Sequence, residues 1–320
     1  MSDARAAGAQ PLLSYCVVNT NDREHLLACL EAIRRTHPPS VEHELLVLDN
    51  ASDDDSARVV RAGWPEVRLI ERDRRAGKAE NDSLLLEQAR GRYCLLLNED
   101  SELQEGCARA LLDALEADPG AVAAGAQLLT SAGAPTDCAW RLPDLSWALA
   151  ATVFQHRRVA VESTGDRVRA VGWVQSSAML VRREAAAAVG WLDPDFFVYS
   201  DETDFCRRLH DAGGRILFVP AARAIHHDQL STDPEAMERR IVEFHRNRDL
   251  YFRKHRMPLT RWAWRICWSW AYAVRALAAI ALPGHDPRRY WLHARQQLLP
   301  SRGEGIREAA ERYNARLAAG

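Results

Sequence analysis

Short apolar runs alternate with segments of helical spacing over the first 130 residues. The runs at 14–19, 45–49, 67–70, 93–97 and 121–129 predict strands. Between them, apolar residues recur every three or four positions at 23–36, 78–90 and 106–117, which predicts helices. Strands that alternate with helices at this spacing predict an α/β fold with a mixed, mostly parallel sheet flanked by helices on both faces.

The pattern is less regular after residue 130. The segment 173–182 is typical of one further strand, and 183–189 and 202–213 are typical of helices. A strand at 215–219 is expected to end at Pro220, because proline cannot donate a hydrogen bond to a neighbouring strand. From Asp233 onward the spacing is helical.

Polar residues follow three of the predicted strands. Asn19 and Asn21 follow the first, Asp49 the second, and 98–100 the fourth. Open α/β sheets bind ligands outside the carboxyl ends of their strands, so we expect these side chains to share one rim. The first strand is not followed by GxGxxG or GxxxxGK[ST], which argues against a dehydrogenase or a P-loop protein.

Two acidic motifs are candidates for chemistry. The first, Leu97-Asn98-Glu99-Asp100, ends an apolar strand in carboxylates, as suits a divalent cation that prefers oxygen ligands. The second, Asp201-Glu202-Thr203-Asp204, crowds three acids, which raises the pKa of some of them and suits a general base. In both cases the alternative is an acidic helix start favoured by the helix dipole.

Two basic motifs have equally plain alternatives. His226-His227 could contact a metal or a phosphate. The alternative is that both are ordinary surface or core histidines. The segment 244–248, Phe-His-Arg-Asn-Arg, offers phosphate contacts through Arg246, or is the basic face of a helix.

The order of these motifs resembles that of the family 2 glycosyltransferases of the GT-A fold, especially the bacterial rhamnosyltransferase-like branch. The resemblance runs from about residue 14 to residue 255. It rests on 46–53 (Leu-Val-Leu-Asp-Asn-Ala-Ser-Asp), 77–81 (Gly-Lys-Ala-Glu-Asn), 97–100 and 189–204, with His226 and Arg246 following in the family's order.

The resemblance implies an inverting transfer from a nucleoside-diphosphate-sugar, with rhamnose suggested by the branch, to an acceptor hydroxyl in cell-surface glycan biosynthesis. It implies a Mg²⁺ or Mn²⁺ ion held by Asp100 and His226, and Glu202 as the base with Asp201 as the second choice. The implied nucleotide-sugar contacts are Asn19, Asn21, Asp49, Gly77, Asn81, Asn98 and Arg246. The implied acceptor or sugar pocket is formed by Trp173, Ser176, Ser177 and Tyr199.

Three positions depart from the family's pattern. Asn98 replaces the first acid of the Asp-X-Asp motif, so Asp100 carries most of the metal binding. Asp201-Glu202 stands where many relatives have Glu-Asp, and Ser176-Ser177 where relatives often have Gly-Ala. The base assignment and the fit of the sugar or acceptor therefore stay open.

Charge and composition bear on the partners. The net charge of −2 argues against a nucleic-acid binder, although residues 246–302 hold twelve Lys or Arg and only two acids. The apolar, tryptophan-rich segment 262–282 contains Arg265 and Arg275, which favours a helix lying in a membrane interface over one that spans the bilayer. The alternative is a helix packed on the catalytic domain or on a second subunit.

The expected organisation is a flexible tail at 1–12, a GT-A catalytic domain at 13–256 and a helical C-terminal region at 257–320. Seven scattered cysteines without CxxC pairs and a start without a signal-peptide pattern favour a cytoplasmic protein, in contact with the membrane's cytoplasmic face if the helix at 262–282 binds lipid. The acceptor is a glycan, a lipid-linked glycan or a small molecule. Rival hypotheses are a nucleotidyltransferase on a related sheet, which lacks the expected basic glycine-rich loop here, and a non-catalytic scaffold, for which loss of the acids would be expected.

Overall fold

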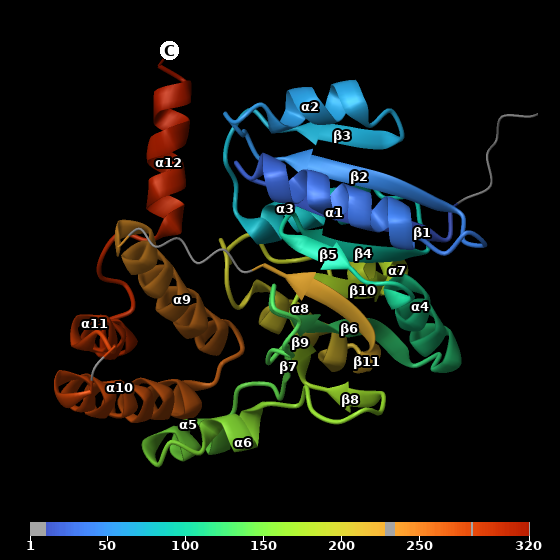
Figure 1. The fold of residues 1–320 in the computed structure, drawn as a ribbon. Coiled ribbons are helices and arrows are strands. Elements are labelled where there is room, and N and C mark those ends of the chain that lie inside the picture. The colour runs from blue at the N-terminus through green and yellow to red at the C-terminus, as the bar shows by residue number, and fades with distance from the viewer. Residues whose placement is uncertain (1–10, 228–233, 283, 320) are drawn as a thin grey trace, which may run out of the picture.

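The computed structural model describes residues 11–227, 234–282 and 284–319, so most of the predicted tail lies outside the described residues. Its centre is a nine-stranded sheet (Figure 1). The strand order is β3 (Val67–Glu71), β2 (His43–Asp49), β1 (Leu13–Asn19), β4 (Tyr93–Asn98), β10 (Ala178–Arg182), β6 (Ala121–Leu129), β11 (Arg215–His226) and β5 (Ser101–Leu103), with β8 (Arg169–Val171) paired to β11.

The sheet is mixed and mostly parallel. Strands β3, β2, β1 and β4 run parallel, β10 lies antiparallel between β4 and β6, and β6 pairs parallel with β11. A second, two-stranded sheet pairs β7 (Ala139–Trp140) with β9 (Trp173–Val174). The predicted fold class is confirmed.

Helices cover both faces of the sheet (Figure 1). The segments α1 (Arg23–Thr36), α2 (Ser56–Gly63) and α4 (Cys107–Ala117) cover one face, and α3 (Lys78–Gln88), α7 (Arg183–Ala188) and α8 (Asp201–Asp211) cover the other. The central strands are buried on both sides, which explains why they appear in the sequence as continuous apolar runs. All seven cysteines are free thiols and six are buried.

Two strand predictions were wrong. The segment 173–182 is two strands, because residues 175–177 leave β9 before β10 begins. Strand β11 does not end at Pro220 but continues to His226. A register shift between Val219 and Arg223 places the proline in a bulge, where its missing N–H breaks no ladder bond.

The rest of the chain is helical, apart from its connections. Along the chain, α5 (Leu145–Thr152) and α6 (His156–Ala160) lie between β7 and β8, and the described chain ends with α9 (Pro234–Lys254), α10 (Pro258–Ala281), α11 (Pro287–Leu298) and α12 (Ile306–Leu317). Helix α10 packs on α5 and α11, whereas α12 returns to the end of the sheet at which β1 and β2 finish (Figure 1). No helix in the described parts of the chain has the length and apolar character needed to cross a bilayer.

Candidate functional site

Neighbouring parallel strands bring the first predicted residues together. Asn19 and Asp49 are register partners at the ends of β1 and β2, and the Asn19 amide donates to the Asp49 carboxylate at 3.0 Å. The other oxygen of Asp49 accepts from the backbone N–H of Ser52 at 2.9 Å. Asp49 is buried, so its carboxylate shapes the loop that follows β2. Asn21 and Ala51 have left-handed backbones, a strained conformation concentrated at functional sites.

Beside this rim lies a cavity of about 340 Å³, which we call the donor-side pocket. Two predicted residues, Asn81 and Asn98, line it. Its other lining residues come from strand ends, from the loop before α3, from 197–198 and from α12: Val18, Thr20, Asn50, Arg75, Ala76, Lys78, Glu99, Phe197, Val198, Ile306, Ala309 and Ala310.

Gly77 permits a close approach of two loops at this pocket. A Cβ atom on Gly77 would lie 2.5 Å from the carbonyl oxygen of Phe197, nearer than carbon and oxygen can pack. The next residue, Lys78, donates its backbone N–H to the same carbonyl at 2.6 Å. Gly77 thus fixes the position of the segment that begins at Phe197.

Arg246 is placed elsewhere. Its guanidinium donates to Glu308 on α12 at 2.7 Å and to the carbonyl of Gly303 at 3.1 Å, and it does not line the donor-side pocket. Asn19, Asn21 and Asp49 form the neighbouring rim and are not among the residues that line the donor-side pocket.

The residues predicted to hold a metal converge at the end of β4. Antiparallel pairing of β5 with β11 sets His226 opposite Ser101, so His226 Nε2 lies 3.2 Å from Asp100 Oδ1. Ser177 Oγ and Asn98 Nδ2 lie 3.2 and 3.4 Å from the same nitrogen. The neighbouring His226 lowers the pKa of Asp100 against the opposing effect of burial. In the described parts of the chain, no group of three or more His, Cys, Asp or Glu side chains is arranged to hold a metal.

Glu99 is a further acid that lines the donor-side pocket. The sequence motif at 97–100 did not assign it a role. Burial, and then the charge of Asp100, raise the pKa of Glu99 to about 8. Burial in this pocket therefore favours the neutral form of Glu99.

The second acidic motif begins α8. Burial and the adjacent Glu202 raise the pKa of Asp201 well above its usual range, and neither carboxylate oxygen of Asp201 accepts a hydrogen bond from a described residue. Residues Tyr199 and Ser200 before it have left-handed backbones. Asp204 points elsewhere: it accepts from Arg208 at 2.8 Å and from His255 at 2.9 Å, so it ties α8 to α9.

Glu202 lines a second cavity, of about 330 Å³, which we call the aromatic pocket. Two of the predicted acceptor residues, Trp173 and Tyr199, line it as well. Most of the remaining lining is aromatic and comes from β7, α5, α9 and α10: Trp140, Trp147, Phe244, Trp264, Trp268 and Tyr272, with Gln175, His245, Arg248 and Gln297 as the polar members. Ser176 and Ser177 are buried outside this lining, and Ser177 lies with the Asp100–His226 pair.

The polar groups of the aromatic pocket are incompletely satisfied. The buried indole N–H groups of Trp147, Trp173 and Trp268 have no hydrogen-bond partner among the described residues. Arg248 lies 5.0 Å from the ring centre of Phe244, and burial lowers its pKa to about 10. Such a pocket offers flat apolar faces with hydrogen-bond donors between them.

Several of these residues were not identified from the sequence. Trp264, Trp268 and Tyr272 lie on α10, whose tryptophans were interpreted as a membrane or packing surface. The α12 contacts arise because Asn314 exchanges hydrogen bonds with the backbone N–H and C=O of Arg75, at 2.7 and 2.9 Å. The spacing of aromatic residues at 264, 268 and 272 was the available signal for a shared helix face.

Comparison with known proteins agrees with this geometry. The family model "Glycosyl transferase family 2" matches residues 14–137, and "Glycosyl transferase family group 2" matches residues 93–299. The chain is 29% identical over 231 residues to the N-acetylglucosaminyl-diphospho-decaprenol L-rhamnosyltransferase of Mycobacterium tuberculosis, covering 65% of this chain and 73% of that protein. It is 42% identical over 57 residues to the rhamnosyltransferase WbbL of Escherichia coli, covering 18% of this chain and 22% of that one.

Among solved structures, the mannosyltransferase PcManGT of Pyrobaculum calidifontis, in complex with GDP-Man and Mn²⁺, superposes with a TM-score of 0.60 at 17% identity. It covers 91% of this chain and 86% of that one. At this identity the likeness establishes the GT-A fold. Together with the family matches, it shows that the chain belongs to the family 2 glycosyltransferases of the rhamnosyltransferase-like branch, and that it is a nucleotide-sugar-dependent transferase of glycan biosynthesis.

Proposed function

We propose that this chain transfers L-rhamnose from a nucleoside-diphosphate-rhamnose to a hydroxyl of a lipid-linked glycan, with inversion at the anomeric carbon. One observation carries the proposal: the segment 197–202 borders both pockets. Phe197 and Val198 line the donor-side pocket, and Tyr199 and Glu202 line the aromatic pocket. A single short segment therefore supports a sugar donor on one side and an acceptor on the other.

The donor diphosphate would bind at the ends of β1 and β4, with Mg²⁺ or Mn²⁺. Asp100 Oδ1 is buried and lies 3.2 Å from His226 Nε2, and no other described residue donates a hydrogen bond to it, so the two residues fit a cation that takes its other ligands from diphosphate oxygens and water. When bound, the cation supplies Lewis-acid neutralisation of the leaving diphosphate. Asn98 and Asn81 would orient the donor, and Asn19 and Asp49 hold the rim.

Glu202 is the proposed base. Its Oε2 is buried without a hydrogen-bond partner in the described structure, and its residue lines the aromatic pocket. As the acceptor oxygen attacks the anomeric carbon, its proton passes to the Glu202 carboxylate and the bond to the diphosphate breaks. Asp201, whose pKa burial and the adjacent Glu202 raise well above its usual range, would act as a positioning residue beside it.

The aromatic pocket would hold the acceptor sugar. Trp140 and Trp173 stack with ring centres 4.2 Å apart, presenting an apolar face to a sugar ring. The free indole N–H groups and Arg248 supply donors for hydroxyl and phosphate oxygens. The M. tuberculosis relative is named for a diphospho-linked N-acetylglucosamine acceptor, and a pocket with aromatic walls and one cation fits an acceptor of that kind.

We propose a catalytic domain at 13–256 and a helical region at 257–320. The helical region contributes lining residues to both pockets. The tryptophan-rich helix α10 would also contact the membrane that carries a lipid-linked acceptor. Seven free cysteines fit a reducing compartment and hence the cytoplasmic face of that membrane.

A donor and acceptor panel tests the proposal. The purified chain is incubated with Mn²⁺ and either a prenyl-diphospho-N-acetylglucosamine analogue or lipid-free N-acetylglucosamine as the acceptor. Each acceptor is tested separately with dTDP-rhamnose, UDP-N-acetylglucosamine and GDP-mannose. We expect a rhamnosylated product only with dTDP-rhamnose. Transfer of a different sugar would disprove the donor assignment, and transfer only to a lipid-free acceptor would disprove the acceptor assignment.

A further inference from the structure

Helix α10 carries a continuous apolar stripe on its outer face. Six of its large apolar side chains are between 56% and 81% exposed: Leu259, Trp262, Ile266, Trp270, Leu277 and Ile280. At 100° per residue these positions fall within about 80° of the helix circumference. The helix contains no acidic residue. An exposed stripe of this length on a water-facing helix is typical of an interaction surface.

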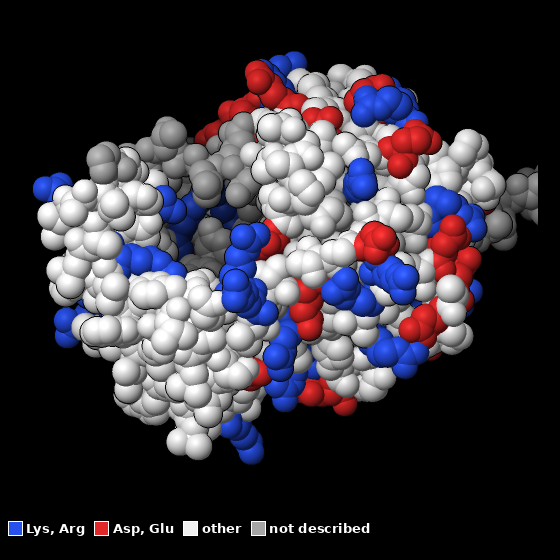
Figure 2. All heavy atoms as spheres, turned by 60° about the horizontal axis from the view of Figure 1, so that its bottom comes forward, with Lys and Arg blue, Asp and Glu red and all other residues white. Residues whose placement is uncertain are grey.

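The arginines of α10 do not interrupt this stripe. Arg261 and Arg265 turn back to Asp249 on α9, at 2.7 and 2.9 Å, and Arg275 lies over the ring of Phe154. Leu145 and Leu149 of α5, the helix that packs on α10, are also exposed. Figure 2 shows a broad surface with few charged residues on the side of the molecule where α5 and α10 come forward.

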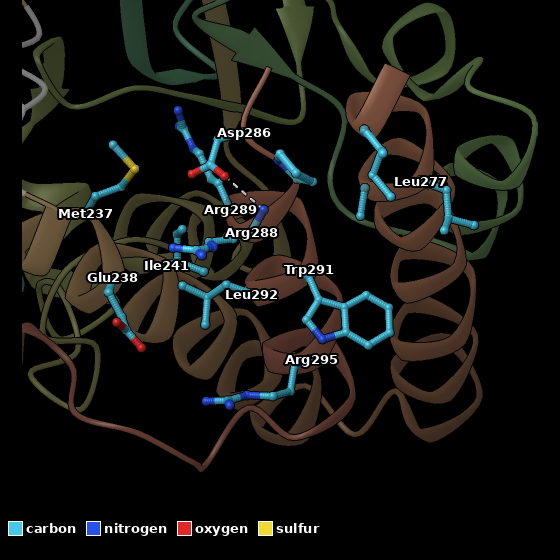
Figure 3. A pocket seen from close by; sticks show the side chains of 13 residues that line it. Met237, Glu238, Ile241, Leu277, Asp286, Arg288, Arg289, Trp291, Leu292 and Arg295 are labelled. Carbon is cyan, nitrogen blue, oxygen red and sulfur yellow. Dashed lines mark hydrogen bonds between the residues drawn. The ribbon is translucent and has the colours of Figure 1, made fainter. Parts of the chain in front are cut away.

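Next to the stripe lies a cavity of about 810 Å³ between α9, α10 and α11, which we call the basic pocket (Figure 3). Its apolar wall includes Leu277 and Ile280 of the stripe together with Trp291. Three arginines line it: Arg288, Arg289 and Arg295. None of the three side chains forms an ion pair or hydrogen bond with another described residue, whereas the nearby Asp286 caps the first turn of α11 by accepting from the Arg288 backbone N–H at 2.9 Å.

Helical spacing explains how cations and apolar groups share this pocket. Arg288, Trp291, Leu292 and Arg295 are separated by three or four positions and so lie on one face of α11. The acids Asp286 and Glu238 also border the pocket, so three positive charges stand against two negative ones. Guanidinium groups without a carboxylate partner favour a phosphate, with which they form paired hydrogen bonds.

The combination selects an amphiphile. A free phosphate would leave the apolar wall in water, and an uncharged lipid would leave three arginines without partners. We infer that the basic pocket binds the phosphate headgroup of an anionic phospholipid while the α10 stripe enters the membrane interface. This inference rests on the proposed membrane contact and adds a second lipid site, separate from the aromatic pocket.

The orientation that results serves the proposed reaction. Trp264, Trp268 and Tyr272 line the aromatic pocket from the side of α10 opposite to the stripe, because they are offset from it by about half a turn. A helix with its side chains is about 10–12 Å across. Docking through the stripe would therefore hold the aromatic pocket about one helix diameter from the interface, within reach of a lipid-linked sugar.

Vesicle binding tests the inference. The full chain is sedimented with vesicles of phosphatidylcholine alone or of phosphatidylcholine and phosphatidylglycerol at 3:1. We expect wild type to bind the anionic vesicles at least 10-fold more tightly. Replacing all three pocket arginines, Arg288→Ala, Arg289→Ala and Arg295→Ala, should weaken binding to the anionic vesicles about 100-fold, since each arginine near an anionic surface contributes about 1 kcal/mol. A charge-matched control, Arg35→Ala, Arg223→Ala and Arg302→Ala, should lose less than 3-fold.

Three results would overturn the proposed headgroup site. Equal binding of wild type to the two kinds of vesicle, or equal losses in the two triple variants, overturns the headgroup site. Arginine-dependent stabilisation by inorganic phosphate without vesicle binding also overturns it, in favour of a free phosphate ligand. Thermal melting confirms that the variants fold, and sugar transfer to a soluble acceptor should be unchanged in the pocket variant. Failure of wild type to transfer sugar would count against the proposed function, not against the vesicle result.

Discussion

His226 Nε2 lies 3.2 Å from Asp100 Oδ1 because β11 runs past its bulge at Pro220 and pairs with β5, the strand that directly follows Asp100. If β11 ended at Pro220, His226 would not pair with Ser101 of β5 and would not be held beside Asp100. The position of the candidate metal site thus depends on a strand extension that the proline made unexpected.

Asp100→Asn should abolish metal-dependent transfer. The substitution keeps the side chain's size but removes the negative charge that offsets a divalent cation, so we expect kcat to fall at least 100-fold at saturating Mn²⁺. Titration of transfer rate against Mn²⁺ concentration measures this. Asp113→Asn, an exposed acid on α4, is the matched control and should behave as wild type. Wild-type activity of Asp100→Asn in the presence of a chelator would contradict the assignment.

Trp268→Ala should weaken acceptor binding. Trp268 lines the aromatic pocket from α10, and the loss of its ring removes apolar contact area and an indole donor. We expect the acceptor KM to rise about 10-fold, equivalent to about 1.4 kcal/mol, with the donor KM within 2-fold. Steady-state kinetics with a soluble acceptor measures both. Trp64, which packs beneath Arg34 away from both pockets, supplies the control Trp64→Ala. A rise in donor KM alone would exclude this role.

Asn314→Ala tests the contribution of α12 to the donor-side pocket. The change removes both hydrogen bonds to the backbone of Arg75, which lines that pocket. We expect a loss of about 1–3 kcal/mol in the free energy of unfolding and weaker binding of a nucleoside diphosphate by calorimetry. Glu311→Ala, exposed on the same helix, is the control. Unchanged nucleotide affinity together with a lower melting temperature would show that α12 only stabilises the fold.

The buried pair His245–His293 predicts an acid-sensitive fold. Burial, followed by Arg289, lowers the pKa of His293 to about 4, and burial and His293 lower that of His245 well below its usual value. The folded state therefore favours the neutral histidines. Protonation costs no folding stability above pH 6.5, and the loss in the free energy of unfolding grows as the pH falls toward 4. For His293 it reaches about 3 kcal/mol.

Denaturant unfolding between pH 8 and pH 4 measures this dependence. His293→Gln should lose less stability than wild type across the interval from pH 6.5 to pH 4, because the glutamine does not titrate. Parallel curves for the two proteins would contradict the prediction.

The alternation of strands and helices was predictable because each buried strand is one continuous apolar run, as 93–97 shows. The rim residues were predictable for a related reason, since parallel strands end at one edge. Contacts between distant segments could not be inferred locally. The spacing of Trp264 and Trp268 places them on one face of a helix, and that spacing is the same for a pocket lining, a core or a membrane surface. Only the packing of α10 against α5 shows that this face lines a pocket. Arg246 was expected at the nucleotide, but Glu308, more than sixty positions later, holds its guanidinium.

Glu202, in the segment that borders both pockets, is the proposed base. The most direct measurement compares kcat for Glu202→Gln and Asp201→Asn, with nucleotide affinity measured alongside. We expect a loss of about 10²- to 10⁴-fold in kcat for Glu202→Gln, with nucleotide affinity within 3-fold of wild type, and a smaller loss for Asp201→Asn. Near wild-type kcat in Glu202→Gln, or a larger loss in Asp201→Asn, would contradict it.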